Sequence, residues 1–198
     1  MDMSDYSDAF RPDLRMTDFS KEALVRMWEA AGKMYTSLAG NYQRVLRERL
    51  GEQVALELDA EVWRRQTPVE VRLCRRAMGI TGDDVASLFK HLQVDPGAGG
   101  IWPEFDLHLK SSNHGILTVK RCIALEHYER HGEQELARLK HTCEVLDGEG
   151  FQDTAALFHP QMIARPLKLP PRSNRDEIAC QWEFKIPQGA APAQMLQQ

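Results

Sequence analysis

The chain has no long apolar run, no excess of positive charge and few cysteines, and each absence excludes a class of protein. No stretch approaches the roughly 20 apolar residues that a bilayer-spanning helix needs. The net charge is −4, so a nucleic-acid partner is not expected. The first 15 residues contain four Asp and no basic start followed by an apolar run, so no signal peptide is predicted. We therefore expect a cytoplasmic protein with neither a membrane nor a nucleic-acid partner.

Several common enzyme motifs are missing as well. The sequence has no phosphate-cradling glycine loop, no G-x-S-x-G turn around a nucleophilic serine and no H-E-x-x-H zinc motif. The 198 residues, 42% hydrophobic and 27% charged, are typical of a globular protein that folds as one cooperative unit.

Helical patterns dominate the first half of the chain. Ser20 is a suitable N-cap for a long helix that ends at Leu50, and Gly51 suits the position after it. A second helix is predicted over residues 52 to 66, and Thr67-Pro68-Val69-Glu70 resembles a capping box that opens a third. A fourth follows from Asp83 to Leu92. The Pro/Gly segment from Asp95 to Gly100 is predicted to be a linking loop.

One apolar stripe on the long helix has two interpretations. Its members step by four and three residues alternately, which places them on one side of the helix. They face either the core of the same chain or a second copy in a symmetric homodimer. The residues are Leu24, Trp28, Ala31, Tyr35, Leu38, Tyr42 and Val45.

After Gly100 the pattern changes to alternation, which is typical of strands. Residues 105 to 110 and Ile116 to Arg121 are predicted to form a hairpin, and two more strands are predicted over Met162 to Leu169 and Ile178 to Ile186. Helices are expected between the two pairs, at 123–131, 133–147 and 151–158. The expected fold is α+β, a helical N-terminal half followed by a four-stranded antiparallel sheet packed on helices. The expected regions are a disordered leader (1–17), a helical region (18–94), an α+β small-molecule or metal-binding domain (100–187) and a disordered tail (188–198).

Three of the four cysteines are predicted to converge. Cys122 follows a strand, Cys143 lies on the apolar face of a helix, and Cys180 shares the inner face of the last strand with Trp182. Reduced thiols in the cytoplasm are buried core residues, metal ligands or nucleophiles, and the spacing alone leaves all three roles open. Cys74 is interpreted as structural.

Other side chains near the thiols are candidates for the same site. Glu126 is a candidate metal ligand and proton carrier, and His127 a candidate catalytic base. Arg121 offers a bidentate fork for a substrate carboxylate, while Trp182 and His114 are candidates for lining the ligand site.

The order of motifs in the second half resembles a known family. Cys122, a helix, Gly132, Cys143 with Asp147 four residues later, and Cys180-Gln181-Trp182-Glu183-Phe184 resemble the L-2-amino-thiazoline-4-carboxylic acid hydrolase-like family. The resemblance to four-vinyl-reductase-type small-molecule domains is weaker. Bacterial and archaeal proteins with the same Leu169-Pro170-Pro171-Arg172 turn and helical first half are closer still.

These resemblances imply an α+β fold and chemistry on small molecules. The hydrolase-like family implies that water opens a small ring of carbon, nitrogen and sulfur. The reductase-type domains imply zinc bound by Cys122, Cys143 and Cys180 with a carboxylate. Thiolate ligands also suit iron, and Glu126 is the candidate carboxylate by its nearness to Cys122.

Three functions are therefore expected as alternatives. The first is a metal-dependent hydrolase, the second a noncatalytic small-molecule-binding or sensory domain with a structural metal, and the third a metal-free enzyme with Cys143 or Cys122 as nucleophile.

Overall fold

A computed structural model gives the arrangement of the chain and describes residues 2–132, 135–136, 138–139 and 142–189. Its helices and strands follow the expected α+β order, with helices first and a four-stranded antiparallel sheet after them. In the described part of the chain, no helix combines the length and the apolar content needed to cross a membrane. The predicted tail lies almost wholly outside the described residues.

The first half consists of four α-helices, after a short 3-10 turn at Met16–Asp18. They are α1 (Lys21–Leu50), α2 (Glu52–Met78), α3 (Val85–Val94) and α4 (Pro96–Ile101). The expected start and end of α1 are confirmed, because the Ser20 side chain accepts a hydrogen bond from the Ala23 N–H and Gly51 has a positive φ of 83°.

Two predicted breaks in this half are wrong. Thr67 does not begin a new helix, since α2 runs through Pro68. The Thr67 hydroxyl donates to the Trp63 carbonyl, and Pro68 lies at an exposed position, where water can bond the carbonyl that the proline ring leaves without a partner. The predicted loop after Asp95 is instead α4. It packs on α1 where Gly32 and Gly100 have no room for a Cβ atom, so their backbones approach closely.

The second half supplies the sheet and the remaining helices. It contains β1 (Glu104–Ser111), β2 (His114–Arg121), α5 (Ile123–Glu129), a π-helical turn η2 (Thr142–Leu146), α7 (Asp147–Phe158), β3 (Ile163–Lys168) and β4 (Cys180–Lys185). The β1–β2 hairpin is confirmed, and the strand order is β1-β2-β4-β3. Part of the predicted helix over 133–147 lies outside the described residues.

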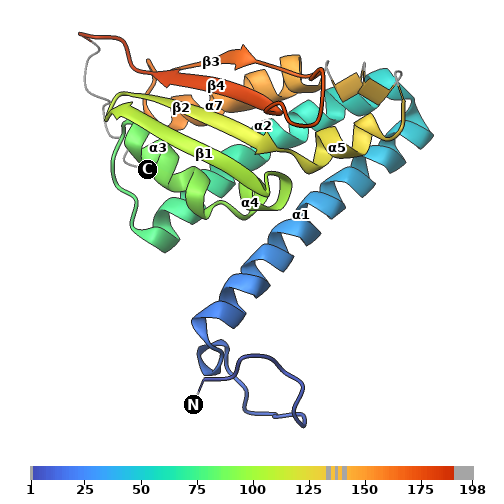
Figure 1. Cartoon of the computed structure of the whole chain (residues 1–198), viewed down its shortest axis with the longest axis vertical. Coiled ribbons are helices and arrows are strands. Elements are labelled where there is room, and N and C mark those ends of the chain that lie inside the picture. The colour runs from blue at the N-terminus through green and yellow to red at the C-terminus, as the bar shows by residue number, and fades with distance from the viewer. Residues whose placement is uncertain (1, 133–134, 137, 140–141, 190–198) are drawn as a thin grey trace.

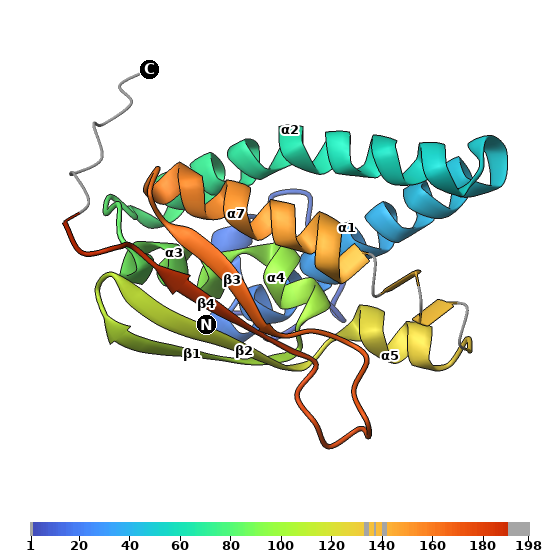
Figure 2. The same ribbon diagram turned by 90° about the horizontal axis from the view of Figure 1, so that it is seen from above.

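The hydrophobic core lies between one face of the sheet and the helices that cover it. Figure 2 shows the sheet, then α7, then α2 in successive tiers. Phe89 of α3 meets Phe184 edge to face, and Phe151 of α7 packs 4.6 Å from Trp182, measured between ring centroids. The predicted inward face of β4, with Trp182 and Phe184, is therefore confirmed.

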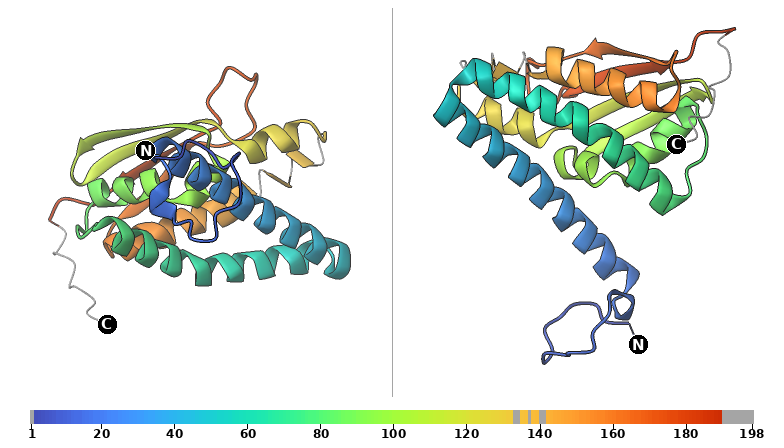
Figure 3. Two further views of the ribbon diagram at one scale, coloured as in Figure 1. Left: turned by 90° about the horizontal axis from the view of Figure 1, so that it is seen from below. Right: turned by 180° about the vertical axis from the view of Figure 1, so that it is seen from behind.

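Helix α1 extends away from this core, as Figures 1 and 3 show. The interpretation of its apolar stripe as core-facing is wrong for the C-terminal part, because Leu38, Tyr42 and Val45 are all exposed. The face that contacts α4 is instead centred on Gly32 and Thr36, which the sequence pattern did not favour because neither residue is strongly apolar.

Candidate functional site

Cys122 and Cys180 lie at the same end of the sheet. Cys122 directly follows β2 as the N-cap residue of α5, and Cys180 begins β4. The register pairs Cys180 with Val119, three residues before Cys122, and the Ala179 N–H donates to the Val119 carbonyl at 2.8 Å. Antiparallel pairing of β2 and β4 therefore brings the two thiols to neighbouring positions above the helices.

Cys143 and Asp147 come to the same place from the helical layer. Cys143 is buried in η2, and Asp147 is the first residue of α7, four positions later. This spacing places both side chains on one side of the helix, and they share a hydrogen bond in which the thiol donates to the carboxylate. A π-helical turn is rare and is found frequently at functional sites.

The four groups are close enough to influence one another's ionisation. Burial raises the pKa of the Cys143 thiol far above its usual range, and the charges of Asp147, Cys122 and Cys180 raise it further. Burial likewise raises the pKa of Cys122 to about 11 and that of Cys180 to about 12. The structure thus brings the three predicted cysteines together and adds Asp147. All three thiols are protonated at neutral pH.

Asp147 is the titratable group of the cluster whose pKa lies nearest to neutrality. Protein atoms packed around the carboxylate remove part of its hydration and raise its pKa to about 6, and the Cys143 hydrogen bond opposes that rise. Its side chain nevertheless keeps contact with solvent. A carboxyl group that is surrounded by protein atoms yet reached by water suits an exchange of protons with a bound molecule.

Trp182 supports the cluster from the core. It is buried and lies two residues after Cys180 on the same face of β4. Its indole N–H donates to the Cys180 sulfur, which favours the thiolate and partly offsets the rise in the Cys180 pKa that burial causes. Trp182 therefore contributes to the site by holding Cys180 in place.

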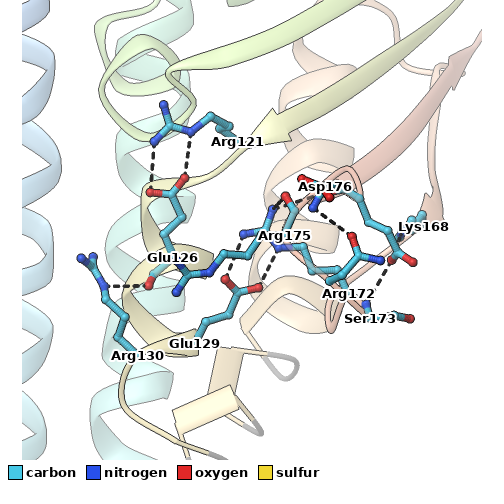
Figure 4. Close-up of polar contacts among 11 residues, drawn as sticks. Arg121, Glu126, Glu129, Arg130, Lys168, Arg172, Ser173, Arg175 and Asp176 are labelled. Carbon is cyan, nitrogen blue, oxygen red and sulfur yellow. Dashed lines mark hydrogen bonds and ion pairs between the residues drawn. The ribbon is translucent and has the colours of Figure 1, made fainter.

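Helix α5 carries two of the predicted catalytic residues, at the edge of the cluster. Glu126 accepts two hydrogen bonds from Arg121, at 2.9 and 3.2 Å, and this partner lowers the pKa of Glu126 (Figure 4). Glu126 lies within electrostatic range of Cys122. His127 points elsewhere, with its ring centroid 4.2 Å from that of His131. The Arg121 guanidinium therefore pairs with Glu126 and not with the substrate carboxylate for which it was a candidate.

His114 lies far from the thiols along the sheet. It begins β2, at the end opposite Cys122, and its ring lies 3.0 Å from a Glu183 carboxylate oxygen on the exposed face. A hollow of about 660 Å³ lined by Gln93 and residues 105–108 contains none of the candidate residues.

A buried ion pair fixes the loop between β3 and β4 beside Cys122. The Arg172 guanidinium donates to both carboxylate oxygens of Glu129 on α5, at 2.7 and 2.9 Å, and to the carbonyls of Arg175 and Glu177 (Figure 4). The Arg172 side chain is only 3% exposed. Arg172 lies within electrostatic range of Cys122, so the Leu-Pro-Pro-Arg turn lies beside the cluster.

The described residues do not form a ready-made metal site. No group of three or more His, Cys, Asp or Glu side chains among them is arranged to hold a metal ion. Cys122, Cys143, Cys180 and Glu126 are all described, so they do not fit a bound ion in this arrangement. Zinc or iron binding stays a prediction.

Comparison with known proteins adds no relative. No family model, no curated protein and no solved structure matches the chain. The case for function therefore depends on the site. The most informative residue of the site is Asp147. The sequence resemblance included Asp147, four residues after Cys143, but gave it no role. The spacing of four residues from Cys143 was the available signal, since it predicts neighbours on a helix.

Proposed function

We propose that the protein is a small-molecule hydrolase in which Cys143 is the nucleophile and Asp147 the general base. The observation that carries this proposal is the hydrogen bond between the two side chains. A protonated thiol is a poor nucleophile, so a buried cysteine needs a base within hydrogen-bond reach. Asp147 meets that need, and its pKa of about 6 leaves it ionised at neutral pH.

The chemistry follows from these two groups. As the Cys143 sulfur bonds to an electrophilic carbon of the substrate, the thiol proton passes to Asp147, which gives it to the departing nitrogen. Water then attacks the same carbon, Asp147 takes the proton from the water, and the carbon–sulfur bond breaks with return of a proton to Cys143. The net reaction adds one water across a carbon–nitrogen bond.

The substrate class is taken from the motif resemblance, a small ring or amide containing carbon, nitrogen and sulfur. Small size agrees with the position of the reactive pair at the junction of η2 and α7, with Arg172 and its loop near the neighbouring Cys122. Cys122 and Cys180 act in this proposal as neighbours that keep the surroundings of Cys143 poorly hydrated.

The proposal is tested with L-2-amino-thiazoline-4-carboxylate as substrate and mass spectrometry of the product. We expect the product to gain the mass of one water, with a rate that rises as pH passes through about 6 because Asp147 must be ionised. Cys143→Ala and Asp147→Asn should each lower turnover at least about a hundredfold, within the range of acid–base and nucleophilic contributions. Cys74→Ala, remote from the cluster on α2, should keep full turnover.

Elemental analysis of the same preparation separates this proposal from the metal-dependent alternative. Activity that survives chelation supports a metal-free thiol enzyme. Stoichiometric zinc or iron whose removal abolishes turnover would contradict it.

A further inference from the structure

The outer face of α1 carries an apolar seam that the described fold leaves uncovered. Met34 and Leu38 are 67% and 66% exposed, Val45 is 52% exposed, and Tyr42, beside the seam, is 58% exposed. The opposite face is in use, because Gly32 and Thr36 pack against α4 and Gln43 bonds to Asp59 of α2. The seam side chains are therefore exposed, on a helix that extends away from the sheet and its covering helices (Figure 3).

The seam has the spacing of a coiled coil. Its positions alternate between steps of four and three residues, and all are exposed or half-buried. A single run of this kind is narrower than the apolar face of a core helix and matches the contact line between two helices. The seam consists of Leu24, Met27, Ala31, Met34, Leu38, Asn41 and Val45.

We propose that this seam binds the same seam of a second copy, with the two α1 helices antiparallel around a two-fold axis near Thr36. In this register Met34 meets Leu38 of the second copy and Met27 meets Val45. Small Ala31 meets Asn41, and Leu24 meets Glu48 at the two ends of the seam, where the exposed carboxylate stays in water. Each of these pairs occurs twice, once on either side of the axis, as a two-fold interface requires.

The exposed apolar area of the seam is large enough to support binding of a second copy. The five largest exposed side chains near the seam present about 500 Å² of surface, at the upper end of what a monomer usually exposes in one patch. Two copies together present about 1,000 Å² from these side chains alone, which reaches the lower bound for a specific interface. These five are Met27, Met34, Leu38, Tyr42 and Val45.

Charge decides the direction of the helices. In a parallel pair the flanking positions place Arg44 of each copy beside Arg49 of the other, and like charges repel. In the antiparallel pair Arg44 faces Ala30 instead. Arg49 then lies near Lys21 only at the two ends of the seam, where Glu48 lies beside both. The antiparallel arrangement therefore avoids repulsion at the centre of the interface.

Sedimentation equilibrium of the full chain at micromolar concentration tests the proposal. The wild type should have twice the 22.6 kDa mass of the chain. Leu38→Glu places two carboxylates in the seam and should raise the dissociation constant at least tenfold. Val25→Glu is the matched control on the same helix, since Val25 is 54% exposed but lies off the seam, and it should leave the dimer intact.

A charge-pair variant tests the register. Met34→Lys alone should weaken the dimer, whereas Met34→Lys combined with Leu38→Glu places opposite charges across the antiparallel seam and should restore it. In a parallel dimer the same double variant opposes like charges and stays monomeric, which would overturn the proposed direction. A monomeric wild type, or a Leu38→Glu protein that dimerises as the wild type does, overturns the interface itself. Circular dichroism verifies folding, and Leu38→Gln replaces Leu38→Glu if the charged variant unfolds.

Discussion

The Asp147 carboxylate lies one helical turn beyond Cys143 and accepts a hydrogen bond from its thiol. This pair joins the π-helical turn to the first residue of α7, at the place where Cys122 and Cys180 arrive from the sheet. Asp147 raises the pKa of all three thiols, and loss of hydration raises the pKa of Asp147 itself, so the thiols stay protonated and the carboxyl group titrates close to neutrality. Such an arrangement destabilises the ionised forms and points to selection for chemistry more than for stability.

Asp147→Asn should therefore stabilise the protein while abolishing its hydrolysis. The folded-state pKa of about 6 is above the ordinary value of 3.8, so ionisation of Asp147 opposes folding. Stability linked to this group is fully present below about pH 3.8 and is lost as pH rises through 6. Because Asp147 keeps contact with solvent, we expect the variant to gain only about 1–2 kcal/mol at pH 7.

Urea unfolding at pH 7 and pH 4 measures this difference. The advantage of Asp147→Asn should shrink toward zero at pH 4, where both proteins carry an uncharged side chain. Asp153→Asn, an exposed position on the same helix, serves as the control and should change stability little at either pH. An Asp147→Asn protein that is less stable at pH 7 would show that the carboxylate has a structural role.

Alkylation of Cys143 should depend on Asp147. The Asp147 charge is the largest cause, after burial, of the raised pKa of this thiol. In the absence of substrate, Asp147→Asn should therefore lower the pKa of this thiol, so that its alkylation by iodoacetamide begins to rise at a lower pH than in the wild type. Peptide mapping distinguishes Cys143 from the other cysteines, and Cys74 provides an internal standard. Equal Cys143 rates in the two proteins would mean that the charge of Asp147 does not act on the thiol.

The ion pair between Arg172 and Glu129 should contribute far more to stability than the pair between Arg121 and Glu126. Both are bidentate, but the side chains of the first pair are 3% and 16% exposed and those of the second 53% and 30%. Glu129→Gln leaves a buried guanidinium without its counter-charge and should cost about 3 kcal/mol. Glu126→Gln should cost less than about 1 kcal/mol. Denaturant unfolding of the two matched variants compares them, and equal losses would contradict this account.

The sequence predicted what depends on local pattern. Ser20 and Gly51 carry the capping chemistry of α1, and the alternation around Trp182 identified the inner face of β4. Inward positions on separate elements predicted that Cys122, Cys143 and Cys180 point toward one interface, because helix and strand periods each specify a face, and the three thiols lie within electrostatic range of one another.

Features that depend on contacts between distant segments were missed. Helix α4 has three glycines among six residues and little intrinsic tendency to be helical, and it forms against the close approach of Gly32. Continuation of α2 through Pro68 depends on an exposed position that sequence pattern does not reveal. The altered pKa of Asp147 likewise arises from burial among residues far apart in the chain.

The central claim is that the Cys143 sulfur is the catalytic nucleophile. Acid-quenched mass spectrometry tests this claim most directly. The protein is mixed with excess L-2-amino-thiazoline-4-carboxylate, quenched within one turnover, digested and mapped. We predict a substrate adduct on the peptide that contains Cys143 and none on the peptides that contain Cys122 or Cys180. Turnover without any adduct on Cys143, or with an adduct on another cysteine, would contradict the account.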